Sequence, residues 1–153
     1  MARFVFKLQP VLDQRAREEQ EKMLIVAELE RERLALESRI RTCQQMMSDE
    51  RRTLSEALGI GRRVDLRAVK MQAGASLKHN FDAQRAVLDL AGIFKKLESA
   101  RAELVTASAR KKAVEMLRDQ QQEEFKREQD LRETRELDEM SVMRHSRREG
   151  HLA

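Results

Sequence analysis

The chain has few of the residues that interrupt helices or build a sheet. It holds five Gly, one Pro, five Phe and no Trp or Tyr among 153 residues. So few Gly and Pro leave few places where the backbone turns at low cost, which predicts long uninterrupted elements. A compact α/β domain needs β-branched and aromatic residues to form a sheet and fill a core. An enzyme is therefore the least expected class.

Signals for export or membrane insertion are also missing. Arg3 and Lys7 interrupt the apolar stretch near the start, and no later run approaches the length of a membrane span. The single Cys43 cannot form an intramolecular disulfide. We expect a cytosolic protein.

No constellation for catalysis, a cofactor or a metal can be named. The histidines His79, His145 and His151 lie far apart, and none has a metal-ligand spacing to Cys43. The sequence Gly59-Ile60-Gly61 lacks the third glycine and the preceding strand of a phosphate-binding loop. Cys43 is better explained as a small buried hydrophobe than as a nucleophile.

The charge is high but balanced. Lys and Arg number 31 against 27 Asp and Glu, and both signs are interspersed, which is typical of a salt-bridged surface. A pI near 9.5 and the Arg-Arg pairs that begin at Arg51, Arg62 and Arg147 keep open a nucleic-acid or membrane-surface binder. No aromatic platform accompanies them, so we expect no specific nucleic-acid binding.

What the chain has in abundance is helix-forming residues. Ala, Glu, Lys, Leu and Arg make up 85 of the 153 residues, which is typical of coiled coils. Alternating steps of three and four residues mark a narrow seam, and eleven of its sixteen positions are apolar. The positions are Val5, Leu8, Leu12, Arg15, Glu19, Lys22, Val26, Leu29, Arg33, Leu36, Ile40, Cys43, Met47, Glu50, Leu54 and Ala57.

A break near the middle predicts that the chain folds back once. The first helix is expected over about residues 5–58, with its true start near Pro10. A tip follows over about 59–75, in which Asp65 caps a short helix from about Leu66 to Ala73 and Gly74 ends it.

A second helix over about 76–146 and a frayed tail over 147–153 complete a single elongated domain, residues 1–153. Its seam is expected at Val87, Leu90, Phe94, Leu97, Leu104, Ala107, Val114 and Leu117. Beyond these, helicity depends on pairs such as Glu123 with Arg127 and Glu128 with Arg132. The fold class is all-α, a long antiparallel two-helix coiled-coil hairpin with a short helical tip.

The apolar patterns suggest a register. They align when Leu58 lies near Lys78, which pairs four sets of residues: Leu54 with Phe81, Met47 with Leu90, Cys43 with Phe94, and Leu29 with Ala107. Five charged seam positions, among them Glu19 and Glu50, indicate a hydrated stretch or one where register matters more than stability. Simple snorkelling of long side chains is the alternative.

Residues at the two ends resemble the flagellar export protein FliJ family over nearly the whole chain. They are the opening Phe4-Val-Phe-Lys-Leu-Gln-Pro-Val-Leu-Asp13, Lys111-Lys-Ala-Val-Glu-Met-Leu117 and Arg135-Glu-Leu-Asp-Glu139. The resemblance implies a non-enzymatic component of the flagellar type III export apparatus. It would act as a stalk in the hexameric export ATPase, contact the export-gate membrane protein and assist export chaperones. Its place would be the cytoplasmic face of the membrane, reached through partners only.

The resemblance also implies two contact sites. The site for the ATPase ring would comprise Phe4, Phe6, Leu8, Val11, Leu137, Asp138 and Glu139. The site for the export gate would comprise Met71, Leu77 and Phe81. In the gate region the sequence departs from the family, with Ala73 and Gly74 where a bulkier aromatic is expected. A coiled-coil adaptor or scaffold unrelated to export would share the same hairpin and remains the alternative.

Overall fold

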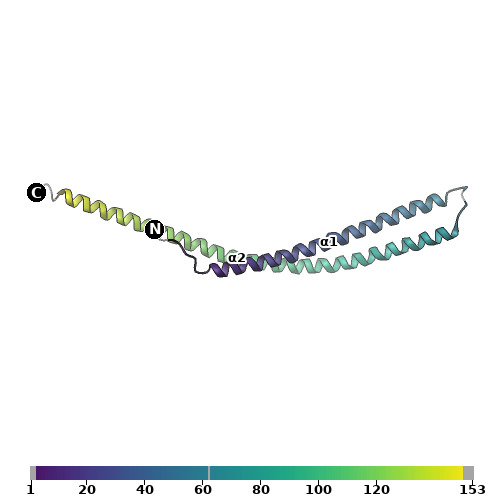
Figure 1. Cartoon of the computed structure of the whole chain (residues 1–153), viewed down its shortest axis with the longest axis horizontal. Helices are drawn as coiled ribbons and strands as arrows, with labels where there is room; N and C mark the ends of the chain where they lie inside the picture. Colours follow the sequence, from purple (N-terminus) through teal and green to yellow (C-terminus); the bar gives the residue numbers. More distant parts are fainter. Residues whose placement is uncertain (1–2, 62, 150–153) are drawn as a thin grey trace. The chain divides into compact units, whose positions relative to one another are not determined.

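The protein consists of two long helices joined by a short connection (Figure 1). The computed structural model describes residues 3–61 and 63–149, with side chains as far as Arg144. Helix α1 spans Gln9–Ala57 and helix α2 spans Leu66–Glu149. The two helices pack against each other antiparallel, and the described residues contain no strand. The predicted all-α hairpin is confirmed.

Two units of the chain are best described separately. One comprises Gln20–Val105, in which most of α1, the connection and the first part of α2 form a hairpin. The other combines the residues up to Glu19 with those from Thr106 onward. The single domain expected over residues 1–153 stays a prediction.

Helix α1 begins directly before its proline. Residues 3–6 have no regular structure, and a turn follows in which the Gln9 N–H donates to the Phe6 carbonyl over 3.2 Å. Pro10 suits the first helical turn because its φ is preset and its missing N–H would have no intrahelical partner there. The helix therefore starts near Pro10, as expected, and not at residue 5.

The predicted tip is wrong in one respect. Helix α2 begins at Leu66 and passes through Gly74 without a break, so no separate short helix ends at Ala73. Among the described residues, the positive φ belongs to Gly61, at 86°. A glycine inside a helix costs about 1 kcal/mol relative to alanine, which a helix of this length tolerates. Asp65 caps α2 as expected and accepts a hydrogen bond from the Arg67 N–H over 2.9 Å.

The far end of α2 is longer than expected. The sequence predicts a helix end near residue 146 and a frayed tail over 147–153, but the helix continues to Glu149, and residues 150–153 lie outside the described part. The predicted pairs are present, since Arg127 lies 3.1 Å from Glu123 and Arg132 lies 4.0 Å from Glu128. Each contributes about 0.2–0.5 kcal/mol to helicity.

The predicted seam of α1 is confirmed over most of its length. Every position of the three-and-four spacing from Leu12 to Leu54 is buried or half-buried. Val5 and Leu8 are exposed, because they precede the helix, and so is Ala57 at its end. A 3.5-residue period therefore identifies the face of α1 that contacts α2. The prediction is wrong only for the positions at the two ends of the seam.

The seam of α2 is predicted correctly in part. The expected Leu90, Leu97, Leu104, Ala107 and Val114 are buried or half-buried, whereas Val87, Phe94 and Leu117 are exposed. Ala86, Ile93 and Ala100 occupy the seam instead, with Ala86 only 1% exposed. A choice of the largest apolar side chains misses alanines, which suit positions where two helices approach closely.

The predicted register is wrong by about one heptad. It would place Glu50 opposite Ala86 or Val87, but Glu50 contacts His79 across the seam. The shift follows from the earlier start of α2, which shortens the connection between the helices. Because a heptad pattern nearly repeats after seven residues, the apolar positions alone do not distinguish these two alignments.

This packing predicts that replacing two leucines of α2 by alanine lowers the free energy of unfolding by different amounts. Leu97→Ala is expected to lower the free energy of unfolding by about 2–5 kcal/mol, because Leu97 is 2% exposed and its removal leaves a cavity. The matched change Leu88→Ala should cost less than about 0.5 kcal/mol, because Leu88 is 73% exposed. Urea unfolding followed by circular dichroism measures both, and equal costs would contradict the seam.

Candidate partner-binding surfaces

The start of the chain folds onto α2. The rings of Phe4 and Phe125 are tilted, with centroids 5.7 Å apart. Phe6 and Leu12 are 7% and 6% exposed, so they form a small core of this unit. Apolar side chains near the start of the chain are therefore wholly or partly covered.

This arrangement separates the expected ring-contact residues. Phe6 is buried and offers little surface to a partner, whereas Phe4 is half-buried. Leu8 and Val11 are 39% and 38% exposed and remain accessible.

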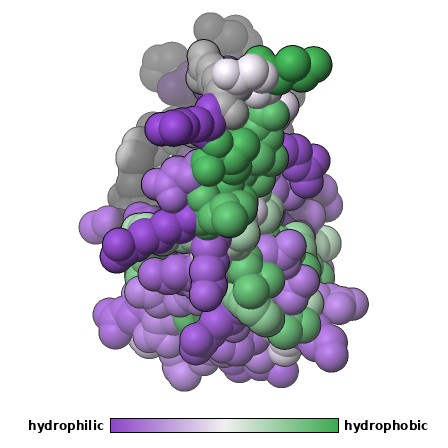
Figure 2. All heavy atoms as spheres, turned by 90° about the vertical axis from the view of Figure 1, so that its right-hand side faces the viewer, coloured by the Kyte–Doolittle hydropathy of each residue, from purple (hydrophilic) through white to green (hydrophobic). Residues whose placement is uncertain are grey.

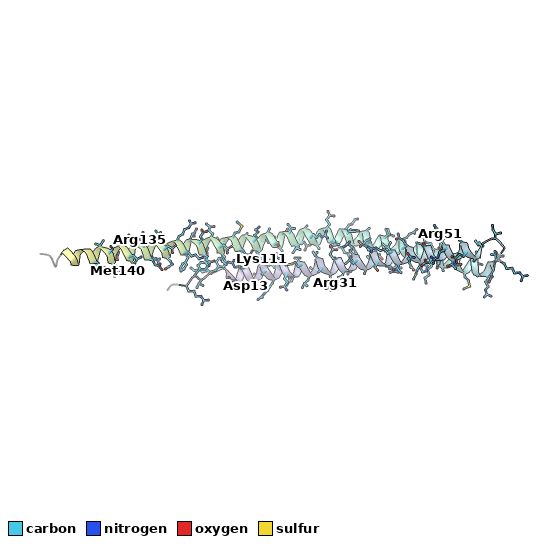
Figure 3. The ribbon with its side chains drawn as sticks, turned by 90° about the horizontal axis from the view of Figure 1, so that it is seen from above. Asp13, Arg31, Arg51, Lys111, Arg135 and Met140 are labelled. Atoms are coloured by element: carbon cyan, nitrogen blue, oxygen red, sulfur yellow. The ribbon has the colours of Figure 1, made fainter. Side chains whose placement is uncertain are left out.

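The other three expected ring-contact residues lie further along α2. Leu137 is 63% exposed, and Asp138 and Glu139 are exposed as well. All described side chains from residue 130 to 144 are exposed, so α1 does not cover this segment and the structure does not bring it to Phe4. Figure 3 shows Arg135 and Met140 on it, with no helix alongside.

This uncovered segment of α2 has a distinct chemistry. Among residues 130–144, five side chains are acidic and three are basic. Exposed apolar residues are interspersed with these charges, namely Leu131, Leu137, Met140, Val142 and Met143. Only Leu137 among these is a contact expected from the sequence. Apolar side chains on an uncovered helix indicate a partner surface.

The expected gate-contact residues are all exposed near the start of α2. Met71, Leu77 and Phe81 are 71%, 59% and 62% exposed. Leu77 and Phe81 are four residues apart and share one side of the helix, whereas Met71 lies on another side. Leu88 extends the side of Phe81 and is 73% exposed, and sequence reasoning missed it.

One charged layer of the seam lies between the start of α1 and α2. The carboxylate of Glu19 accepts hydrogen bonds from the Lys111 ammonium, over 2.8 Å, and from the Ser108 hydroxyl. The bond from Lys111, followed by that from Ser108, lowers the pKa of Glu19 against the opposing effect of burial. The same contact raises the pKa of Lys111. Glu19, a charged position of the seam, is thus paired with Lys111 on the other helix. This pairing favours the interpretation that charged seam positions set the alignment of the two helices.

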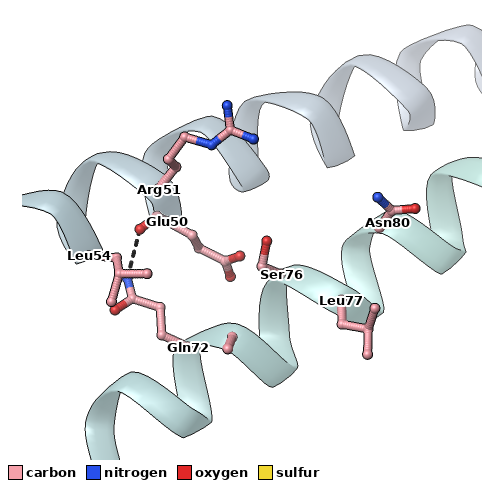
Figure 4. Close-up of a pocket in the computed structure, with 8 residues that line it drawn as sticks. Glu50, Arg51, Leu54, Gln72, Ser76, Leu77 and Asn80 are labelled. Atoms are coloured by element: carbon pink, nitrogen blue, oxygen red, sulfur yellow. Dashed lines mark hydrogen bonds between the residues drawn. The ribbon is translucent and has the colours of Figure 1, made fainter. Parts of the chain in front are cut away.

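A second polar layer lies between the end of α1 and the start of α2. Glu50 Oε1 is 3.5 Å from His79 Nε2, and the Glu50 carbonyl accepts a hydrogen bond from the Gln72 amide over 3.0 Å. Glu50 Oε2 is buried and has no hydrogen-bond partner among the described residues. Glu50, Ser76 and Leu77 are among the residues that line a pocket of about 360 Å³. The Ser76 side chain points toward Glu50 (Figure 4).

The described residues form neither a metal-binding cluster nor a helix that could span a membrane. They contain no group of three or more His, Cys, Asp and Glu side chains placed to hold a metal ion. Cys43 is buried in the seam. No helix of the described ranges is both long and apolar enough to cross a bilayer.

Comparison with known proteins agrees with the resemblance seen at the two ends of the chain. The family model described as Flagellar FliJ protein matches residues 4–150. No curated protein and no solved structure matches the chain.

The Glu19 layer predicts a dependence of stability on acid. Because the folded state lowers the pKa of Glu19, its contribution is present above the ordinary value of 4.5 and is lost as the pH falls through the lowered one. Glu19→Gln should therefore reduce stability at neutral pH and flatten its decline from about pH 6 to pH 3.

Urea midpoints across this pH range measure the effect. Glu98→Gln is the matched control, since Glu98 is exposed and should leave the decline unchanged. If the urea midpoints of the wild type and of Glu19→Gln fall in parallel as the pH is lowered, Glu19 does not contribute the expected acid dependence of stability.

Proposed function

Since the chain belongs to the FliJ family and is thereby a component of the flagellar export apparatus, we propose that it is the stalk of the export ATPase. The stalk would enter the pore of the hexameric ring and also contact the membrane export gate. It would assist export chaperones as well. The role is structural and regulatory, without catalysis, and its place is the cytoplasmic face of the membrane at the flagellar base.

The observation that carries this proposal is the segment of α2 that α1 leaves uncovered. Its side chains from residue 130 to 144 are all exposed, and they mix acidic groups with single apolar ones such as Leu137. A stalk that meets successive subunits of a ring must form moderate contacts without adhering to one of them. Mixed polar and apolar contacts suit that requirement better than a large dry interface.

The geometry refines the set of ring-contact residues. Leu137, Asp138, Glu139, Leu8 and Val11 are accessible and stay in the proposed surface. Phe4 presents only part of its ring, and Phe6 supports the surface from inside the unit. We therefore expect substitutions of Phe6 to act through stability.

The gate contact is proposed for the start of α2. Leu77 and Phe81 form an exposed apolar pair on one side of the helix, and Met71 lies near them in sequence. Exposed large apolar side chains clustered in this way are typical of a protein interface.

The ring contact predicts an effect of Leu137→Ser on the cognate export ATPase. The variant should lose most of its stimulation of ATP hydrolysis and hexamer formation, with an apparent affinity about tenfold lower, because one exposed apolar anchor is removed. Leu88→Ser is the matched control, because Leu88 is similarly exposed and belongs to the other unit. If both variants stimulate as the wild type does, Leu137 is not part of the contact.

The gate contact predicts an independent loss. Leu77→Ser combined with Phe81→Ser should weaken binding to the cytoplasmic part of the export gate by at least about tenfold. Stimulation of the ATPase should stay unchanged, because these residues lie in the other unit.

Binding to the gate is measured by calorimetry, with Val105→Ser as the control at another exposed apolar site. Undiminished binding of the double variant would place the gate contact elsewhere. A chain that binds neither ATPase nor gate would instead be an adaptor of another kind.

A further inference from the structure

The connection between α1 and α2 exposes apolar side chains at the end of the hairpin. Ile60 is fully exposed, and Leu66, Leu58 and Val64 are 78%, 50% and 44% exposed. Figure 2 looks at the molecule from this end and shows apolar residues gathered in a patch beside hydrophilic ones. We call Leu58, Ile60, Val64 and Leu66 the tip patch.

Basic side chains surround the tip patch. Five described Lys and Arg residues within about two helical turns of it are exposed, against two acidic residues. The basic residues are Arg51, Arg52, Arg63, Arg67 and Lys70, and the acidic ones are Glu56 and Asp65. The Asp65 carboxylate already accepts a hydrogen bond as the cap of α2. Arg52 Nη2 lies 3.7 Å from the Asp49 carboxylate, so the positive charge of this surface comes mainly from the other four cations.

These cations differ from those in the seam. Lys22 Nζ lies 2.6 Å from Glu103 Oε2, and Lys111 Nζ lies 2.8 Å from Glu19 Oε2. Both cations are therefore paired with a carboxylate of the same chain. Within the part of the chain that the structure describes, Arg63, Arg67 and Lys70 form no ion pair. Their charge is available for an external anion.

We propose that the tip patch and its basic surround dock directly on an anionic lipid bilayer surface. The apolar residues enter the boundary between headgroups and acyl chains, and the guanidinium and ammonium groups contact lipid phosphates. Apolar burial combined with attraction to anionic lipid is the basis of interfacial membrane binding. This contact adds a direct one to the membrane association expected through partners alone.

The composition of the tip favours a bilayer over nucleic acid. Binding of single strands requires aromatic side chains on which bases stack, and residues 51–70 contain none. A fully exposed isoleucine gains nothing from a polyanion in water, whereas it loses contact with water in a bilayer. The proposal does not depend on the stalk function, because vesicles alone test it.

A single fluorophore tests the apolar contact. The chain has no Trp or Tyr, so Ile60→Trp creates the one indole of the protein. With vesicles of phosphatidylcholine containing about a third phosphatidylglycerol, its emission should shift to the blue and be quenched by brominated acyl chains. Vesicles of pure phosphatidylcholine should cause neither effect. Val105→Trp, an exposed site away from the tip, is the control and should respond to neither vesicle.

Charge variants test the electrostatic contact. Arg63→Gln with Arg67→Gln and Lys70→Gln should lower partitioning into anionic vesicles about 100-fold, at about fivefold for each basic residue. The matched control removes the same charge elsewhere on α2, through Lys95→Gln, Lys96→Gln and Lys112→Gln, and should change partitioning by less than about twofold. Circular dichroism verifies that both remain helical.

Three results would overturn the proposal. The first is absence of vesicle binding, or equal binding to neutral and anionic vesicles. The second is an equal loss in the two charge variants, which would indicate general attraction to a polycation. The third is binding that Ile60→Ser leaves unchanged and that duplex DNA abolishes by competition, which would identify the surface as a site for polyanions.

Discussion

The structure depends on the alignment of α1 against α2. The connection over residues 58–65 is short, so the start of α2 lies close to the end of α1, and the seam follows from there. Since α2 has 84 residues and α1 has 49, this alignment leaves the last part of α2 without a partner helix. The exposed surfaces that we propose as partner contacts thus depend on one register.

Polar layers select that register among alignments that apolar residues tolerate almost equally. A slip of one heptad would keep a three-and-four pattern in contact with another such pattern. It would also separate Glu19 from its ion pair with Lys111 and remove the contact between Glu50 and His79. Loss of the contacts of these carboxylates disfavours the slipped alignment, whereas the apolar contacts would change little. The charged seam positions therefore contribute specificity at some cost in packing.

The sequence is sufficient for the fold class and for the contact face of α1, because a 3.5-residue period held over many turns is typical of helices that pack along a narrow seam. It is insufficient for the start of α2, where Gly74 indicates a helix end although the helix continues through it. That error moves the expected register by a heptad. The accessible ends are predicted from apolar content, but only the folded structure distinguishes the buried Phe6 from the exposed Leu137.

Disulfide formation between seam positions tests the register most directly. In a Cys43→Ala background, the pair Glu50→Cys and His79→Cys should close on oxidation, because these residues are in contact. The pair Glu50→Cys and Ala86→Cys lies one heptad away, roughly 10 Å further along the helix, and should stay reduced. If the second pair closes and the first does not, the alignment and the surfaces derived from it are wrong.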